Sequence, residues 1–179
     1  MANCLTIGNC IAKNCRNAVP GISKIYLANF GDIDTITING TTDEVSAITM
    51  HTGATQCFYS VEVPRENLSI TDDLVINVPN GTAIFKPKVE FSIPKIDEDT
   101  LNIFNALSQA TVMVIATGLD SVNYLLGATN GLDLETGSLA SGKASGDFQG
   151  FMGALTGLEP HSLRVINSAV TISTLLCNC

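Results

Sequence analysis

The sequence contains no tryptophan, and aromatic residues make up only 6% of it. Basic side chains are also scarce: nine lysines and arginines stand against 17 acidic residues, which gives a formal net charge of −8. The few aromatic rings offer no platform on which bases or sugars stack, and the negative charge repels nucleic acid. We therefore expect that the protein does not bind nucleic acid. The charge is compatible with a surface along which nucleic acid slides without binding.

Long apolar runs are absent as well. No stretch approaches the roughly 18 residues that a membrane-spanning helix requires, and the N-terminal MANCLTIGNCIAKNCRN lacks a basic region followed by an apolar core. We expect no signal peptide, no membrane association and synthesis in a cytoplasm. A length of 179 residues and a hydrophobic content of 45% fit one folded domain with extensions.

Motifs for catalysis are missing. The two histidines, His51 and His161, lie in neither a nucleophile elbow nor a metal-binding helix motif. Residues 137–144, GSLASGKA, are similar to a phosphate-binding loop, but Ala144 stands where a serine or threonine must ligate magnesium. In a phosphate-binding loop a helix begins directly after the lysine, and the glycines that follow here disfavour a helix. We therefore expect neither an enzyme nor a cofactor.

Cysteine is the exception to this scarcity, with six residues. Five lie near the ends of the chain and the sixth, Cys57, lies in its interior; the terminal ones are Cys4, Cys10, Cys15, Cys177 and Cys179. Their spacing differs from the close pairs of structural zinc sites, so we predict no metal site. If the two ends meet, the terminal thiolates can hold a metal or crosslink subunits; the simpler interpretation is reduced thiols in partly ordered tails. Cys57 alternates with apolar residues, which indicates a small buried side chain.

Alternation of apolar and polar residues predicts that most of the chain forms β-strands. The clearest segment is 82–93, in which Pro87 predicts an edge strand or a bulge, because proline cannot donate a ladder hydrogen bond. Pro79-Asn80-Gly81 predicts the turn of a hairpin that joins this segment to 68–78. The other predicted strands are 25–29, 36–39, 45–51, 56–63, 112–117, 132–135, 148–155 and 163–175.

One segment has helical spacing instead. Asp97-Glu98-Asp99 precedes apolar residues three and four positions apart, and acidic residues at a helix start complement the helix dipole. We predict one α-helix over about residues 98–109. The predicted fold is mostly β, a β-sandwich or barrel body with this one flanking helix. Residues 21–176 form the predicted β domain, with a cysteine-containing extension at 1–20 and a Cys-x-Cys tail at 177–179.

Residues 123–160 contain more than half of the 15 glycines, with apolar residues between them. The segment begins with an apolar stretch that leads into an NGL turn. A short strand follows, and then a loop of serine, glycine and lysine. After this loop, G-D-x-x-G-F leads into a strand that ends in G-x-E-P. This order of motifs resembles the closing section of bacteriophage major tail tube proteins; the cysteine-rich ends depart from the family pattern. The residues that we expect to serve assembly, and not catalysis, are Asn130, Gly131, Gly142, Asp147, Gly150 and Glu159.

The resemblance implies a structural protein of the virion tail. In such a protein six copies form a ring, rings stack into a hollow tube, and each subunit donates strands to a continuous inner barrel. The segment that bridges to the next ring would be 127–146 or, alternatively, 40–56. The implied partners are further copies of the chain and other tail proteins, while phage DNA passes through the lumen without specific binding. Two alternatives stay open: a monomeric β-sandwich module for binding or decoration, and a related tail-terminator or injection-system ring.

Overall fold

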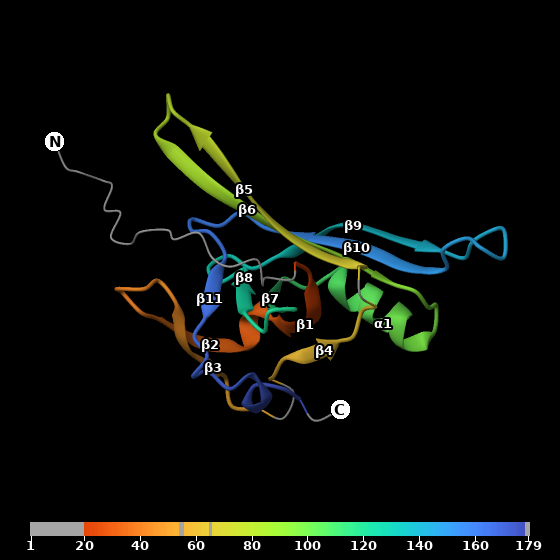
Figure 1. The fold of residues 1–179 in the computed structure, drawn as a ribbon, viewed down its shortest axis with the longest axis horizontal. Helices are drawn as coiled ribbons and strands as arrows, with labels where there is room; N and C mark the ends of the chain where they lie inside the picture. The colour runs from red at the N-terminus through yellow and green to blue at the C-terminus, as the bar shows by residue number, and fades with distance from the viewer. Residues whose placement is uncertain (1–19, 54–55, 65, 178–179) are drawn as a thin grey trace.

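Two β-sheets and one α-helix make up the part of the chain that the computed structural model describes, residues 20–53, 56–64 and 66–177 (Figure 1). The seven-stranded sheet contains β1 (Ile22–Asn29), β2 (Ile33–Ile38), β3 (Val45–Met50), β4 (Tyr59–Val61), β7 (Val112–Gly118), β8 (Asn123–Leu126) and β11 (Arg164–Ile166). The four-stranded sheet contains β5 (Leu68–Asn77), β6 (Thr82–Ile93), β9 (Asp133–Ala140) and β10 (Gly150–Thr156), and the helix is α1 (Glu98–Leu107). The prediction of a mostly β body with one flanking helix is confirmed.

The seven-stranded sheet has the order β2-β3-β11-β8-β7-β1-β4, and only β3 and β11 run parallel. Strand β7, VMVIATG, lies in the interior of this sheet between β8 and β1 and is apolar on both faces, so it supplies two separate cores. Val114 and Ala116 face the four-stranded sheet and helix α1, where they join the larger core. Met113 and Ile115 face the other way into a second core, which the segment 170–176 covers. The body is therefore a sandwich whose larger sheet is buried on both sides.

The four-stranded sheet has the order β5-β6-β10-β9 and consists of two antiparallel hairpins. The two turns lie at opposite ends of the sheet, because Gly150 follows the β9–β10 loop and lies beside Ile93, at the end of β6 that is far from its turn with β5. Figure 1 shows the β5–β6 hairpin projecting from one end of the molecule and the β9–β10 hairpin from the other. Gly81, with φ +64°, permits the β5–β6 turn predicted at Pro79-Asn80-Gly81.

Pro87 does not mark an edge, since β6 lies between β5 and β10 with no register shift on either side. Its carbonyl oxygen accepts a hydrogen bond from Gly157 N at 3.3 Å, on the side away from β5. The proline nitrogen faces the same side, because both polar groups of a residue in an antiparallel strand point the same way. Strand β10 has ended at Thr156, so the missing N–H removes no hydrogen bond from either ladder.

Helix α1 follows the prediction closely. Asp97 caps it: its carboxylate accepts hydrogen bonds from Thr100 N at 2.9 Å and from Thr100 Oγ1 at 2.7 Å. The Lys95 ammonium, 2.5 Å from the same carboxylate, and these Thr100 donors hold the pKa of Asp97 well below its usual value. Leu107 packs into the larger core, with Ile103 and Phe104 beside it, so the helix closes one end of the sandwich.

Several predicted strands are wrong in extent, and one strand was not predicted. Segment 132–135 covers only the start of the eight-residue β9, and β2 begins three residues before the predicted segment 36–39. Segment 163–175 forms only the three-residue β11, because Asn167 starts a turn: its side chain accepts from Ala169 N at 2.9 Å and its carbonyl from Val170 N at 2.9 Å. Segment 56–63 shortens to the three residues of β4. The unpredicted strand is β8, which pairs with both β7 and β11.

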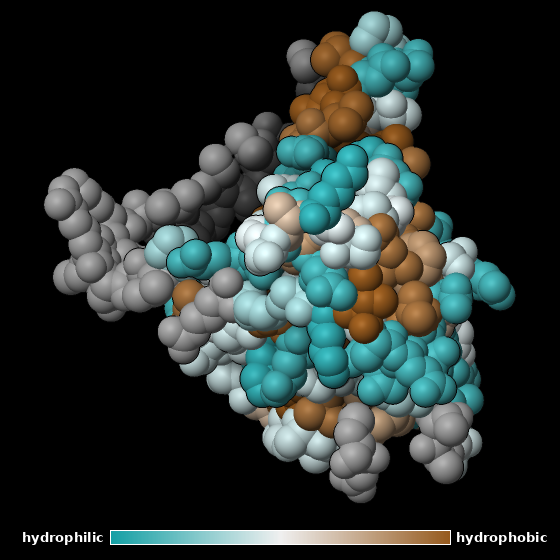
Figure 2. All heavy atoms as spheres, turned by 90° about the vertical axis from the view of Figure 1, so that its right-hand side faces the viewer, coloured by the Kyte–Doolittle hydropathy of each residue, from teal (hydrophilic) through white to brown (hydrophobic). Residues whose placement is uncertain are grey.

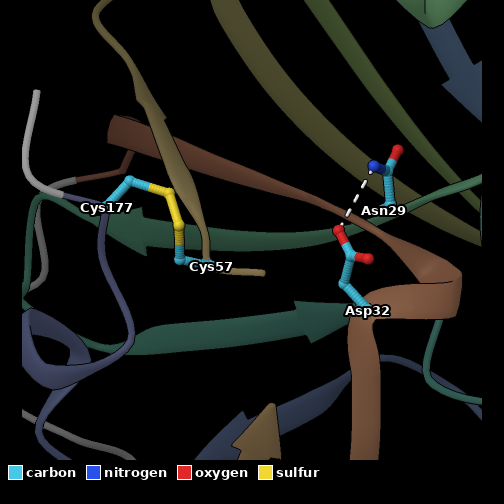
Figure 3. The surroundings of a disulfide bond; sticks show 4 residues. All are labelled: Asn29, Asp32, Cys57 and Cys177. Carbon is cyan, nitrogen blue, oxygen red and sulfur yellow. Dashed lines mark hydrogen bonds between the residues drawn. A yellow bond between two sulfur atoms is a disulfide. The ribbon is translucent and has the colours of Figure 1, made fainter. Parts of the chain in front are cut away.

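The Cys57 side chain forms a disulfide bond with Cys177, with Cα atoms 5.3 Å apart (Figure 3). The interpretations of Cys57 as a packed, unlinked residue and of Cys177 as part of a free tail are therefore wrong. Backbone bonds accompany the disulfide: Phe58 N donates to Leu175 O at 2.8 Å and Cys177 N to Phe58 O at 3.0 Å. The other four cysteines lie outside the described residues, so the predictions about their metal binding or crosslinks stay untested.

Candidate assembly surface

The end of the β5–β6 hairpin exposes the most conspicuous apolar surface of the described chain. We call residues 74–85, LVINVPNGTAIF, the hairpin tip; it contains no charged side chain. Its large exposed side chains, with the exposed fraction of each, are Leu74 50%, Val75 56%, Ile76 60%, Val78 81% and Ile84 38%. They lie on both faces of the hairpin, because successive residues of a strand point to opposite sides. Figure 2 shows this apolar surface on the projection at the top of the view. A protruding apolar hairpin of this kind indicates a surface that binds another protein surface.

The body supports the hairpin only up to the base of the tip. Phe85 exchanges two backbone hydrogen bonds with Glu159, at 2.9 and 2.8 Å. On the other strand, the Asp72 carboxylate accepts from Ser162 Oγ at 2.6 Å and from Leu163 N at 2.9 Å. Beyond these contacts the two strands pair only with each other among the described residues. The tip is thus presented on a fixed base, and its apolar side chains stay exposed among the described residues.

Strands β5 and β9 end the four-stranded sheet, and neither pairs with a further strand within the described residues. Along β9, residues 136, 138 and 140 hydrogen-bond toward β10, so the N–H groups of Gly137 and Leu139 point to the free edge. The same alternation on β5 directs the N–H groups of Ile70, Asp72 and Leu74 outward. Both edges therefore present backbone donors and acceptors that no strand of the described residues uses, and another strand could pair with them.

The outer face of the four-stranded sheet is open and carries mainly polar side chains, with the apolar Met152 exposed among them. It forms a hollow of about 490 Å³ whose walls include hydroxyl and other small side chains: Ser69, Ser92, Thr136, Ser138, Gly153 and Ala154. Its charged groups are paired: Lys88 Nζ lies 2.5 Å from Glu90 Oε1 on the same strand, and Lys86 Nζ lies 3.5 Å from Glu135 Oε1 on β9. This face therefore presents a mixed, largely neutralised surface and no concentrated positive patch.

Three of the residues expected to serve assembly, Asn130, Gly131 and Glu159, lie together at the base of the hairpin tip. The Glu159 side chain is 4% exposed and accepts hydrogen bonds from Thr129 N at 3.1 Å and from Asn130 N at 2.9 Å. Asn130 Nδ2 donates to Leu158 O at 2.6 Å, and Gly131 adopts φ +79° against Phe30 and Thr111. These contacts hold the turn after β8 against the segment that supports Phe85, and a role of the three residues in assembly stays a prediction.

The other three, Gly142, Asp147 and Gly150, shape the β9–β10 loop. Asp147 Oδ2 accepts from Lys143 N and Ala144 N, both at 2.9 Å, and these two backbone donors lower the pKa of the carboxyl group. A phosphate-binding loop would direct such amides at its ligand; here the chain's own carboxylate occupies them. Gly142 adopts φ +70°, and Gly150 lies against the Ile93 carbonyl, where a side chain would clash. Their contact with another subunit stays a prediction.

The two segments expected to bridge between rings lie partly in the sheets, and their contact with another ring stays a prediction. Segment 40–56 supplies β3, and segment 127–146 supplies β9 and part of its hairpin loop. The hairpin tip was not among the expected contact residues. The signal that could have identified it is the uncharged run LVINVPNGTAIF, in which both faces of the predicted hairpin are apolar.

Neither histidine lies in a catalytic arrangement on the described chain. His51 Nδ1 is 3.9 Å from Asp34 Oδ1 on the surface, and the described residues contain no group of three or more side chains suited to a metal ion. Among the same residues, no helix is long and apolar enough to cross a membrane. Comparison of the chain with protein-family models, with curated proteins and with solved structures finds no match.

Replacing Glu159 with alanine is expected to lower the free energy of unfolding by about 1–3 kcal/mol, because the amides of Thr129 and Asn130 lose a charged acceptor in a buried position. Glu135→Ala removes a half-exposed carboxylate from β9 and should change stability by less than about 0.5 kcal/mol. Urea unfolding followed by circular dichroism measures both. Equal midpoints for the two variants would contradict the role assigned to Glu159.

Proposed function

We propose that this protein is a structural subunit that assembles with copies of itself into closed rings, which stack into a hollow tube of the phage tail kind. The observation that carries the proposal is the four-stranded sheet, whose two edges pair with no other strand of the described residues, and from each end of which a hairpin projects. Pairing with another copy of the chain would use the backbone donors and acceptors of both edges. Lateral pairing of β5 of one copy with β9 of the next joins the sheets into a continuous barrel.

Ring closure follows from the nature of the proposed contact. The edges of β5 and β9 are different surfaces, so the interface is heterologous, and such an interface generates a ring when its rotation closes. A closed ring leaves no strand edge of this sheet exposed. The projecting hairpins then extend from the two rims of the ring, where they are available to further rings.

The polar face of the four-stranded sheet suits the lumen of such a barrel. The other face packs against the seven-stranded sheet, so only the polar one can line an inner wall. Its lysines are paired with carboxylates, and the whole chain carries −8. A lumen without a free positive patch allows phage DNA to pass without binding.

Size-exclusion chromatography with light scattering, followed by negative-stain electron microscopy, tests the proposal. We expect rings or tubes with a central channel to form as the protein concentration rises. A protein that remains monomeric at millimolar concentration would contradict it and favour the monomeric binding or decoration module. Rings that never stack would favour a tail-terminator or injection-system ring.

A further inference from the structure

An apolar groove lies between helix α1 and the edge of the seven-stranded sheet. Its volume is about 690 Å³. The helix contributes Ile103, Ala106 and Leu107, and strands β1 and β4 contribute Leu27, Ala28 and Val61. A hollow of this size holds a ligand as large as several apolar side chains. We call it the α1–β4 groove.

The hairpin tip cannot reach the α1–β4 groove of its own chain. The tip lies at the start of β6, whereas α1 follows the other end of that strand. Twelve residues of extended chain separate the two ends, which corresponds to about 40 Å. Figure 1 shows the tip and α1 at opposite ends of the molecule. A contact between these surfaces therefore joins two copies, head to tail.

The chemistry of the two surfaces matches. The hairpin tip is the uncharged projection of an acidic chain, so it can approach another copy without bringing carboxylates into contact. The rim of the groove carries Asp99 and Asn102, and the tip carries the amides of Asn77 and Asn80, which can donate hydrogen bonds to that carboxylate. The apolar side chains of the tip then have the floor of the groove to cover them.

We propose that the hairpin tip of one copy inserts into the α1–β4 groove of a copy in the neighbouring ring. This inference rests on the proposed function and specifies its axial contact. In a barrel built from the four-stranded sheet, the two ends of β6 lie at opposite rims of the ring. Every ring therefore presents tips on one rim and grooves on the other, and the tube grows with a single polarity.

Two substitutions test this contact from its two sides. Ile76→Asp places a charge on the tip, where the side chain is 60% exposed, and Ala106→Arg fills the groove from an exposed position of the helix. Both variants should form rings but yield at least tenfold fewer particles longer than one ring, counted by negative-stain microscopy. The matched controls are Leu158→Asp, at an apolar side chain 58% exposed outside the tip, and Asn105→Arg, on the same helix outside the groove lining. Both controls should stack as the unmodified protein does.

A mixture of the two variants sharpens the test. Rings of the Ala106→Arg variant retain intact tips, and rings of the Ile76→Asp variant retain intact grooves. Mixed one to one, they should form stacks of two rings and no longer tubes, because every further contact needs a surface that one variant lacks.

The possible failures are distinguishable. Tubes of normal length from the Ala106→Arg variant would overturn the groove assignment while leaving ring assembly intact. Loss of rings in both variants, with the controls unaffected, would show that the contact lies within a ring and would also overturn it. A monomeric unmodified protein would overturn both this inference and the proposed function.

Discussion

Replacing Cys57 and Cys177 together with serine is expected to lower the free energy of unfolding by about 3–5 kcal/mol, the largest stability change that we predict. The disulfide joins residues 120 positions apart, so it restricts the unfolded chain over most of its length. Restriction of so long a loop corresponds to about 4–5 kcal/mol in the chain-entropy account. The folded state should keep its shape, because Phe58 remains buried and bonded to the segment that ends at Cys177.

The measurement requires that the other four cysteines be held constant. In a background where Cys4, Cys10, Cys15 and Cys179 are serine, only the Cys57–Cys177 bond can form. Urea unfolding of this background, oxidised and then reduced, should show the same loss as the double serine variant. Reduction of the double serine variant itself should change nothing. An oxidised background that unfolds at the same urea concentration as its reduced form would contradict the assignment.

Elements with strong local signals were predictable from the sequence. The bounds of β6 agree with the predicted segment 82–93, since apolar and polar residues alternate from Phe85 to Ile93. Helix α1 begins at the residue after Asp97, whose carboxylate supplies the cap that the acidic cluster indicated. The glycine at the β5–β6 turn likewise has a local role that its neighbours in the sequence reveal.

Features that depend on distant contacts were not predictable. Pro87 is tolerated in a central strand only because β10 ends one residue earlier along the ladder, which no property of β6 alone indicates. The disulfide pairs two cysteines whose sequence neighbours give no sign of each other. Segment 163–175 is rich in β-branched residues, yet the side chain of Asn167 stops the strand after three residues. In the candidate assembly surface, the turn at Pro79-Asn80-Gly81 was predictable. The exposure of the hairpin tip was not, because it depends on how far the rest of the protein extends along the hairpin.

Replacing Leu139 with proline is expected to raise the protein concentration needed for ring formation by about tenfold or more. The Leu139 N–H points to the free edge of β9, so proline removes a donor from the proposed lateral contact and none from the pairing with β10. One lost hydrogen bond at each interface contributes about 1 kcal/mol, and the proline ring additionally keeps the approaching strand away. Because a ring closes only when all its interfaces form, the effect accumulates around the circle.

Leu139→Ala is the matched control, since it removes the same side chain but keeps the N–H group. Both variants should be folded, with circular dichroism spectra like that of the unmodified protein, because edge strands tolerate proline. Sedimentation velocity over a range of concentrations should then show rings for Leu139→Ala and monomers for Leu139→Pro. Equal ring formation by the two would exclude β9 edge pairing. Loss of rings in both would assign the contact to the Leu139 side chain, which is 37% exposed, and not to the backbone of the strand. The comparison therefore separates assembly by strand pairing from assembly by side-chain packing.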